Sequence, residues 1–162
     1  MLINDHEAAT AQILGLSNDL MPTRSSGRGF GEPRTDFGPA IPLVSDAVEA
    51  GLPRHALRHV AEWLSGGDAA RVASLEWGIV PKATLERRGL KLSVAESERT
   101  ERVARLIVHA RSTFGSDAPA RSFLLSPNDG LDGHTPFDMA ETDQGTRRAG
   151  EILDALENGR LL

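Results

Sequence analysis

The sequence of 162 residues contains no cysteine and no tyrosine, and aromatic residues make up only 4% of it. Without cysteine the chain can form neither disulfides nor thiolate metal ligands, which fits a reducing compartment. The shortage of aromatic side chains argues against a stacking surface for single-stranded nucleic acid. No apolar run approaches the roughly 18 residues of a membrane-spanning helix, and the N-terminus has no signal-peptide pattern. We therefore expect a globular protein of the cytoplasm, made of one ordinary domain or two very small ones.

Positive charge is also scarce, because the formal net charge is −5. This balance excludes a uniformly basic nucleic-acid coat, but it leaves room for a local basic patch. Residues 78–111 contain eight basic and four acidic side chains, whereas the segments before and after them are net acidic. Of the 18 basic residues, 16 are arginine. Binding of carboxylates or phosphates would explain that bias, and so would a GC-rich genome.

The first 40 residues predict a flexible arm. Residues 22–40 are rich in Gly, Pro, Ser and Arg and show no periodicity, so they cannot bury enough apolar surface to offset the entropy of ordering. A short helix over residues 6–14 is the one element that we expect within this arm.

From residue 42 onward the chain predicts helices separated by short turns, and therefore an all-α fold. Asp68 is placed to cap one helix, and Ser93 with Glu96 forms a capping-box pattern before a long helix over about 94–114. Helical spacing predicts inward faces on three of the helices, formed by Leu57, Val60, Ala61 and Leu64, by Val103, Ile107, Ala110 and Phe114, and by Ala149, Ile152, Leu153 and Leu156. No segment alternates with period two for long enough to predict a strand.

Residues 68–88 predict two short helices joined by a turn at Gly78, which is the helix-turn-helix pattern. Ile79 and Leu85 would anchor the second helix to the core. Its outward face could then enter a major groove. We assign DNA contacts on this face to Lys82, Arg87, Arg88 and Lys91. We expect three arginines further along the chain to extend the positive field, namely Arg99, Arg102 and Arg105. A plain helical corner with solvated charges is the alternative, and Glu86 partly cancels the charge of the face.

Catalytic and metal sites have little support in the sequence. His55 and His59 lie one helical turn apart, but no third ligand is evident, and a solvent-facing pair is favoured. The cluster of Asp129, Asp132, His134 and Asp138 lacks calcium-loop spacing, and residues 27–31 lack the strand and helix that a phosphate-binding loop needs. We therefore expect no enzyme activity, no cofactor and no metal site. Within residues 120–145 we expect a tightly specified loop between helices, with Leu131 as a plug into the core.

Half of the chain, from Gly78 to Gly159, resembles a known family. The matching segments are GIVPKATLERR, LSVAESERTERVARLI, STFGS, FLLSPNDGLDGHTPFDMAETDQG and ILDALENG. The most specific part is the loop that contains Pro127, Asn128, Leu131, Gly133, Thr135 and Pro136, followed by Glu141, Thr142 and Gly145. These segments are similar to the antitoxins of the Xre/MbcA/ParS group, the partners of RES-domain toxins. Phe123 stands where the family usually has Trp, and it can fill the same core position.

The resemblance implies an Xre-like helix-turn-helix region over residues 41–99 and a toxin-binding domain over residues 100–162. RES toxins resemble ADP-ribosyltransferases and consume NAD. In this family the end of the antitoxin reaches the active-site cleft of the toxin, which by position implies toxin contacts at Asn158, Gly159, Arg160, Leu161 and Leu162. The resemblance also implies a homodimer, a hetero-oligomer with the toxin, and in some members binding to the antitoxin's own promoter DNA.

The chemistry of this end is consistent with that role. A pocket for NAD must present Arg or Lys to the phosphates, so the terminal carboxylate, Asp154 or Glu157 could pair there while the leucines fill an apolar side. A frayed tail is the alternative, since chain ends are usually poorly ordered. A DNA-binding autoregulator that acts through the helix-turn-helix is the second functional hypothesis, and the two functions are compatible.

Overall fold

The computed structural model describes residues 5–16, 44–87 and 89–159. Within these ranges every regular element is helical, and the only β-type pairing is an isolated bridge between Pro53 and Lys91. The all-α prediction is confirmed. The elements are α1 (Asp5–Ile13), α2 (Val44–Glu49), α3 (Arg54–Ser65), α4 (Ala69–Ile79), α5 (Lys82–Arg87), α6 (Val94–Phe114), α7 (Asp117–Leu125), a 3₁₀ helix η1 (Asp129–Leu131), α8 (Pro136–Met139) and α9 (Asp143–Glu157).

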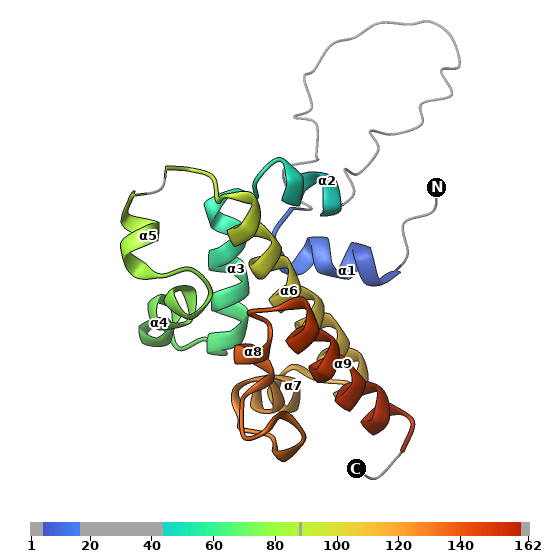
Figure 1. The fold of residues 1–162 in the computed structure, drawn as a ribbon. Coiled ribbons are helices and arrows are strands. Elements are labelled where there is room, and N and C mark those ends of the chain that lie inside the picture. Colours follow the sequence, from blue (N-terminus) through green and yellow to red (C-terminus); the bar gives the residue numbers. More distant parts are fainter. Residues whose placement is uncertain (1–4, 17–43, 88, 160–162) are drawn as a thin grey trace, which may run out of the picture.

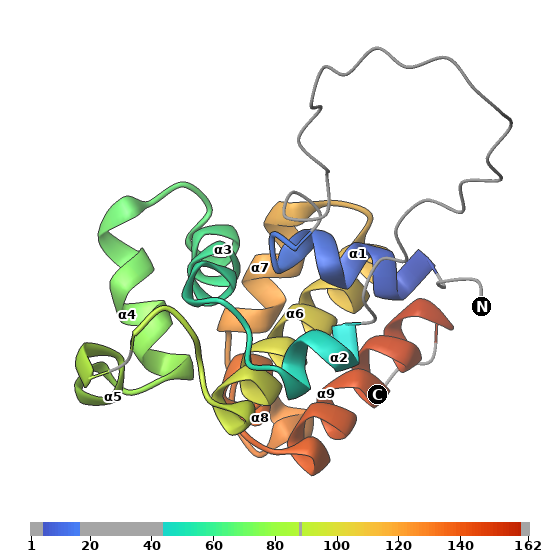
Figure 2. The same cartoon turned by 90° about the horizontal axis from the view of Figure 1, so that it is seen from above.

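The long helix α6 lies at the centre of the molecule, with α1, α2, α3, α7 and α9 packed around it (Figure 1). Its start is fixed by the predicted capping box, since the Ser93 hydroxyl accepts from Glu96 N and the Glu96 carboxylate accepts from Ser93 N at 2.7 Å. Its end is Gly115, in the left-handed conformation at φ 70°. In the view from above, α4 and α5 lie on one side of the molecule and α9 on the other (Figure 2).

The core contains most of the side chains that periodicity placed there. The predicted inward faces of α3, α6 and α9 are buried at Leu57, Val60, Ala61, Leu64, Val103, Ile107, Ala110, Ala149, Ile152 and Leu153, and Phe114 packs against this core while only partly buried. Leu156 is an exception, because it remains 43% exposed in the last turn of α9. The apolar face of α9 therefore ends at Leu153. No helix in the described part of the chain is long and apolar enough to cross a membrane.

The prediction of a flexible N-terminal arm is wrong for residues 5–16, because these residues pack against the bundle. The helix expected over residues 6–14 is present as α1, and it packs against α6 and α3. Ala11, Ile13 and Leu14 are buried, with Leu14 fully so. These three apolar side chains dock the helix, so this part of the arm belongs to the bundle. Residues 17–40, which contain the Gly- and Pro-rich stretch, lie outside the described residues.

The predicted turn at Gly78 is also wrong. Gly78 lies inside α4, which continues to Ile79, and the change of direction occurs at Val80 and Pro81. A Cβ atom at Gly78 would lie 2.9 Å from the Phe137 ring, which is closer than real Cβ contacts. Glycine is therefore needed here because α4 packs closely against α8, and not because of a left-handed backbone.

Candidate partner-binding surfaces

The loop between α7 and α8 is rigidly built. Asn128 accepts from Gly130 N at 2.8 Å and caps η1, while Asp132 and Gly133 adopt left-handed conformations at φ 56° and 80°. Leu131 is completely buried, which confirms that it is a plug into the core. Arg148 on α9 ties the loop down, since its Nη2 donates to the Gly130 carbonyl at 3.2 Å and to the Asp132 carboxylate at 3.0 Å.

The predicted loop residues thus divide into two sets. Asn128, Leu131 and the buried Pro136 hold the loop together, and Thr135 caps α8 by accepting from Asp138 N at 3.0 Å. Pro127 and Gly133 are exposed on the surface. The loop therefore supports α9 through Arg148 more than it offers side chains of its own to a partner.

The last turn of α9 is an exposed acidic surface that also carries one apolar side chain, Leu156. Asp154, Leu156, Glu157, Asn158 and Gly159 are all exposed, and the Asn158 amide donates to the Asp154 carbonyl at 2.6 Å. This turn contains no basic residue. The predicted contacts at Arg160, Leu161 and Leu162 lie outside the described residues. We call residues 154–159 the α9 end.

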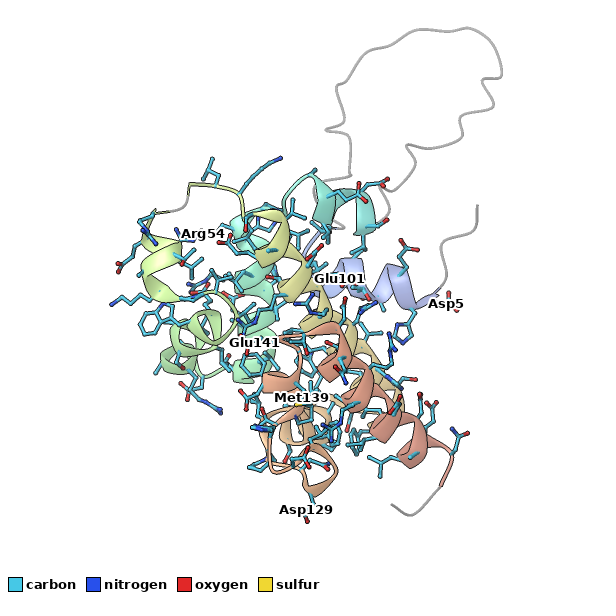
Figure 3. The ribbon with its side chains drawn as sticks, viewed as in Figure 1. Asp5, Arg54, Glu101, Asp129, Met139 and Glu141 are labelled. Carbon is cyan, nitrogen blue, oxygen red and sulfur yellow. The ribbon has the colours of Figure 1, made fainter. Side chains whose placement is uncertain are left out.

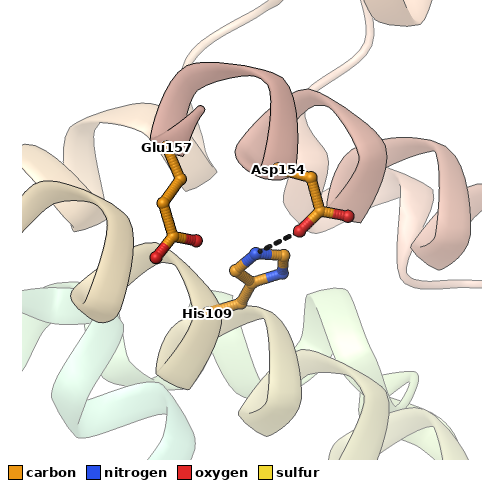
Figure 4. A group of neighbouring side chains, drawn as sticks. All are labelled: His109, Asp154 and Glu157. Carbon is orange, nitrogen blue, oxygen red and sulfur yellow. Dashed lines mark ion pairs between the residues drawn. The ribbon is translucent and has the colours of Figure 1, made fainter. Parts of the chain in front are cut away.

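A histidine from α6 faces the α9 end. The His109 Nε2 atom lies 3.1 Å from an oxygen of Asp154, and Glu157 stands on the same face of α9 (Figure 4). The imidazole is 21% exposed, and the ring of His6 from α1 meets it edge to face at a centroid distance of 6.2 Å. No partner for His109 can be identified from the sequence, because this contact depends on the register in which α6 and α9 pack.

The second candidate surface is formed by α4 and α5. Ile79 and Leu85 are each 2% exposed, so the predicted anchors of the helix-turn-helix are confirmed. Lys82 is exposed, but it pairs with Glu86 at 3.8 Å and lies over the Trp77 ring at 5.0 Å. Arg87 donates to the Ala83 carbonyl at 3.2 Å.

Two further residues were assigned to this surface. Lys91 donates to the Ala50 carbonyl at 3.5 Å, which places its amino group beside the turn between α2 and α3. Arg88 lies outside the described residues. The sequence pattern therefore identified the helices correctly, but it did not show that Lys82 and Arg87 have acceptors within their own helix.

The expected extension of the positive field along α6 is wrong, because those arginines bind acceptors of the fold. Arg102 donates to the carbonyls of Ala140 and Glu141, both at 2.9 Å, and its side chain is only 12% exposed. Arg99 donates to the Gly78 carbonyl at 2.9 Å. Arg105 pairs with Glu101 at 3.1 Å.

Arg99 and Arg102 instead connect α6 to α4 and to the turn between α8 and α9. Arg99 links the end of α4 to the turn between α8 and α9, where its Nη1 lies 3.8 Å from Glu141 (Figure 3). Arg102 binds the backbone of that same turn. Nothing in the spacing of these arginines along the sequence shows that they face carbonyl groups.

Among the described residues, Glu101 is the acidic residue whose carboxyl pKa is shifted. It lies on α6 beside α1 and lines an open pocket of about 440 Å³ between α1, α2 and α6 (Figure 3). Burial raises the pKa of its carboxyl above the ordinary 4.5, and the neighbouring Arg105 and Arg102 offset only part of that effect.

Comparison with known proteins matches both halves of the described structure. Residues 44–105 match the Xre-like helix-turn-helix domain of antitoxins, and residues 109–159 match the C-terminal toxin-binding domain of Xre/MbcA/ParS antitoxins. This order of domains defines a helix-turn-helix antitoxin. The chain belongs to the Xre/MbcA/ParS family of antitoxins.

Among relatives, the chain is 34% identical over 84 residues to a protein named Antitoxin Xre from Pseudomonas putida. The match covers 50% of this chain and 53% of that protein, so the chain spans about half the length of this relative. The predicted domain boundary at residues 99 and 100 falls inside α6, a helix that packs against elements of both domains.

Proposed function

We propose that the chain neutralises a RES-domain, NAD-consuming toxin by occupying the toxin's active site with its C-terminal region. The observation that carries this proposal is the exposed α9 end, which lies inside the matched toxin-binding domain and presents the carboxylates of Asp154 and Glu157 together with Leu156, which is 43% exposed.

The electrostatics of the α9 end suit a pocket that binds a dinucleotide. Such a pocket presents cationic donors to phosphate oxygens, and charge-assisted pairs with carboxylates use the same donors. The carbonyl end of a helix adds negative partial charge to Asp154 and Glu157. Leu156, together with Leu161 and Leu162, would fill the apolar part of the pocket. Inhibition then needs only occupancy and no chemistry on the antitoxin, which makes the chain a binding protein rather than an enzyme.

Truncation after Asn158 tests the proposal. Removing residues 159–162 leaves the helices intact, so we expect a folded antitoxin that no longer prevents NAD loss in cells that co-express the toxin. The double variant D154N/E157Q should weaken suppression in the same direction. The matched control is D46N/E49Q, which removes two exposed carboxylates at the same spacing on α2. Full suppression by the truncated chain would refute active-site occupancy.

Co-purification separates binding from inhibition. If the truncated chain still assembles with the toxin but leaves NAD turnover active, the rest of the domain supplies the affinity and the α9 end supplies the block. If no stable assembly forms with the full chain, the toxin partnership itself is wrong. Turnover of NAD by the purified antitoxin alone would contradict the assignment as a non-enzymatic protein.

A second function, autoregulation through DNA, is supported by the anchored helix pair α4 and α5. Lys82 and Arg87 are exposed on α5, and Arg88 follows them in the sequence. We expect promoter DNA to shift in a salt-dependent manner, and R87A/R88A to lower both the affinity and the salt slope. R147A, an exposed arginine on α9, is the control. Absence of a shift at low salt would remove this function.

We also propose that the chain forms a homodimer in the cytoplasm. Trp77, Leu90 and Val94 are large apolar residues that stay exposed, at 42%, 88% and 46%. Small helical proteins often cover such residues in a symmetric partner. Light scattering of the purified chain gives its mass directly, and a monomer at micromolar concentration would contradict the dimer.

A further inference from the structure

His109 forms a cluster with Asp154 and Glu157, two carboxylates to which the proposed function gives only a role in pairing with the toxin. One histidine nitrogen and one oxygen from each carboxylate all lie within 4.8 Å of one another. The carboxylates sit three residues apart on α9, and the imidazole approaches them from α6 (Figure 4). Two packed helices thus bring three potential metal ligands to one point.

The histidine is held in place by its surroundings. Its side chain is 21% exposed, so the ring is largely enclosed by the bundle while Nε2 faces the carboxylates. The Nε2 contact with Asp154 at 3.1 Å sets the direction of the ring. Asp154 and Glu157 are exposed, which leaves the cluster accessible to an ion from solvent.

The charge at this position also favours a cation. The last turn of α9 contains two carboxylates and no basic residue. Cations are stabilising at the C-terminus of a helix and anions are not, so this turn is arranged against the helix dipole. A divalent ion would balance both carboxylates and would add positive charge where the carbonyl groups converge.

We propose that His109, Asp154 and Glu157 bind a first-row divalent transition-metal ion of the Zn²⁺ type. A ligand set of one imidazole nitrogen and two carboxylates suits Zn²⁺, whereas Mg²⁺ and Ca²⁺ prefer oxygen ligands alone. Three protein ligands leave a coordination position for water.

A second histidine pair provides the comparison. His55 and His59 lie one turn apart on α3 with ring centroids 5.9 Å apart. Within the described ranges no Asp, Glu or further His joins them to make a group of three. We therefore expect the tightest ion to bind at His109 and not at this pair.

Metal binding by the free chain can be tested without a toxin. Calorimetric titration of the full chain with Zn²⁺ at neutral pH should show one equivalent bound. H109Q should weaken that binding at least about tenfold, since even outer-shell partners contribute 10–100-fold to metal affinity. D154N/E157Q should do the same, while D46N/E49Q and H55Q/H59Q should retain it. Co²⁺ should give an absorption spectrum in the parent chain that H109Q abolishes.

The outcomes separate cleanly. Circular dichroism checks whether H109Q remains helical. If H109Q does not fold, D154N/E157Q still tests the site, because it changes only exposed side chains. No Zn²⁺ binding to the parent chain, equal binding by H109Q, or loss of binding in H55Q/H59Q would each overturn the site. Because the toxin is absent, a failure here leaves the proposed inhibition of the toxin untouched.

Discussion

Two glycines of α9, five residues apart, show that the same residue type can be required at one position and replaceable at another. Gly145 is buried in the first turn, where a Cβ atom would collide with the Met139 carbonyl oxygen. Gly150 lies on the same helix, and there a Cβ atom would meet His109 Nδ1 only at 3.8 Å, which is an ordinary contact. Both positions read alike in the sequence, so only the packing of α8 against α9 distinguishes them.

The two positions predict opposite changes in stability. G145A should lower the free energy of unfolding by about 1–3 kcal/mol, because the new methyl group forces α8 away from α9. G150A should raise it by about 0.5–1 kcal/mol, because alanine loses less conformational entropy in a helix. Urea unfolding followed by circular dichroism measures both. Equal effects of the two substitutions would contradict the close α8–α9 contact.

Glu101 predicts a pH dependence of stability. Its pKa is raised above the value of 4.5 that applies in the unfolded chain, so the folded protein holds the proton more tightly. Stability is therefore greatest below pH 4.5 for this group, and it falls as the pH rises from 4.5 through the raised pKa. E101Q cannot ionise, so it should be more stable than the parent above that window.

The matched control for E101Q is E151Q, which changes an exposed glutamate on α9. Urea unfolding at a series of pH values should show a smaller pH dependence for E101Q and little change for E151Q. A parent-like pH dependence in E101Q would mean that its two arginine neighbours fully offset the burial.

At the scale of elements, helix ends were more predictable than helix contacts. The caps at Asp68 and Ser93 form as the sequence indicates, because a cap depends on residues within one turn of each other. The burial of Leu57 or Ile107 follows from local periodicity as well. The turn assigned to Gly78 failed, because a glycine required by close packing looks the same as one required by a left-handed turn.

The candidate surfaces were predicted less well than the helices for the same reason. Arg99 and Arg102 look like free surface charges along the sequence, yet their acceptors come from α4 and from the α8–α9 turn. His109 and Asp154 are separated along the chain by α7, η1 and α8. Contacts of this kind depend on the register of packed helices, which no short motif encodes.

The capping box of α6 can be tested by itself. S93A should lower the free energy of unfolding by about 0.5–2 kcal/mol, because Glu96 N loses its acceptor at the helix start. S112A, on an exposed position of the same helix, should be neutral or slightly stabilising, since alanine is the better helix former. Denaturant unfolding compares the two, and a neutral S93A would show that packing alone fixes where α6 begins.

For the whole molecule, the decisive feature is that α6 and its arginines join the two domains. Arg102 donates to two backbone carbonyls of the α8–α9 turn while its side chain is mostly buried. The Phe137 ring of α8 lies against Gly78 of α4, so these two helices are also in contact. The helix-turn-helix and the toxin-binding domain are therefore joined by side-chain contacts as well as by the continuous helix α6.

R102A tests this connection. It removes the donor from two carbonyls, so the free energy of unfolding should fall by about 1–3 kcal/mol. Hydrogen exchange should increase most at α8 and the start of α9. R147A, an exposed arginine of α9, should change stability by less than about 0.5 kcal/mol. If R102A matched R147A, the turn would be held by other contacts.

A helix that belongs to both halves restricts how such antitoxins can exchange partners. A crossover between two genes at the predicted boundary, residues 99 and 100, would join the first quarter of one α6 to the remainder of another. Such a hybrid leaves Arg99 with Gly78 and Arg102 with Ala140 of the same parent, but it pairs Arg99 with a foreign Glu141 and joins two unlike parts of one core helix. A junction at Gly115 keeps that helix whole, and the carbonyls that Arg102 binds are backbone groups that either parent supplies. Chimaeras that switch immunity from one poison to another should therefore tolerate a junction at Gly115, after α6 is complete, far better than a junction inside it.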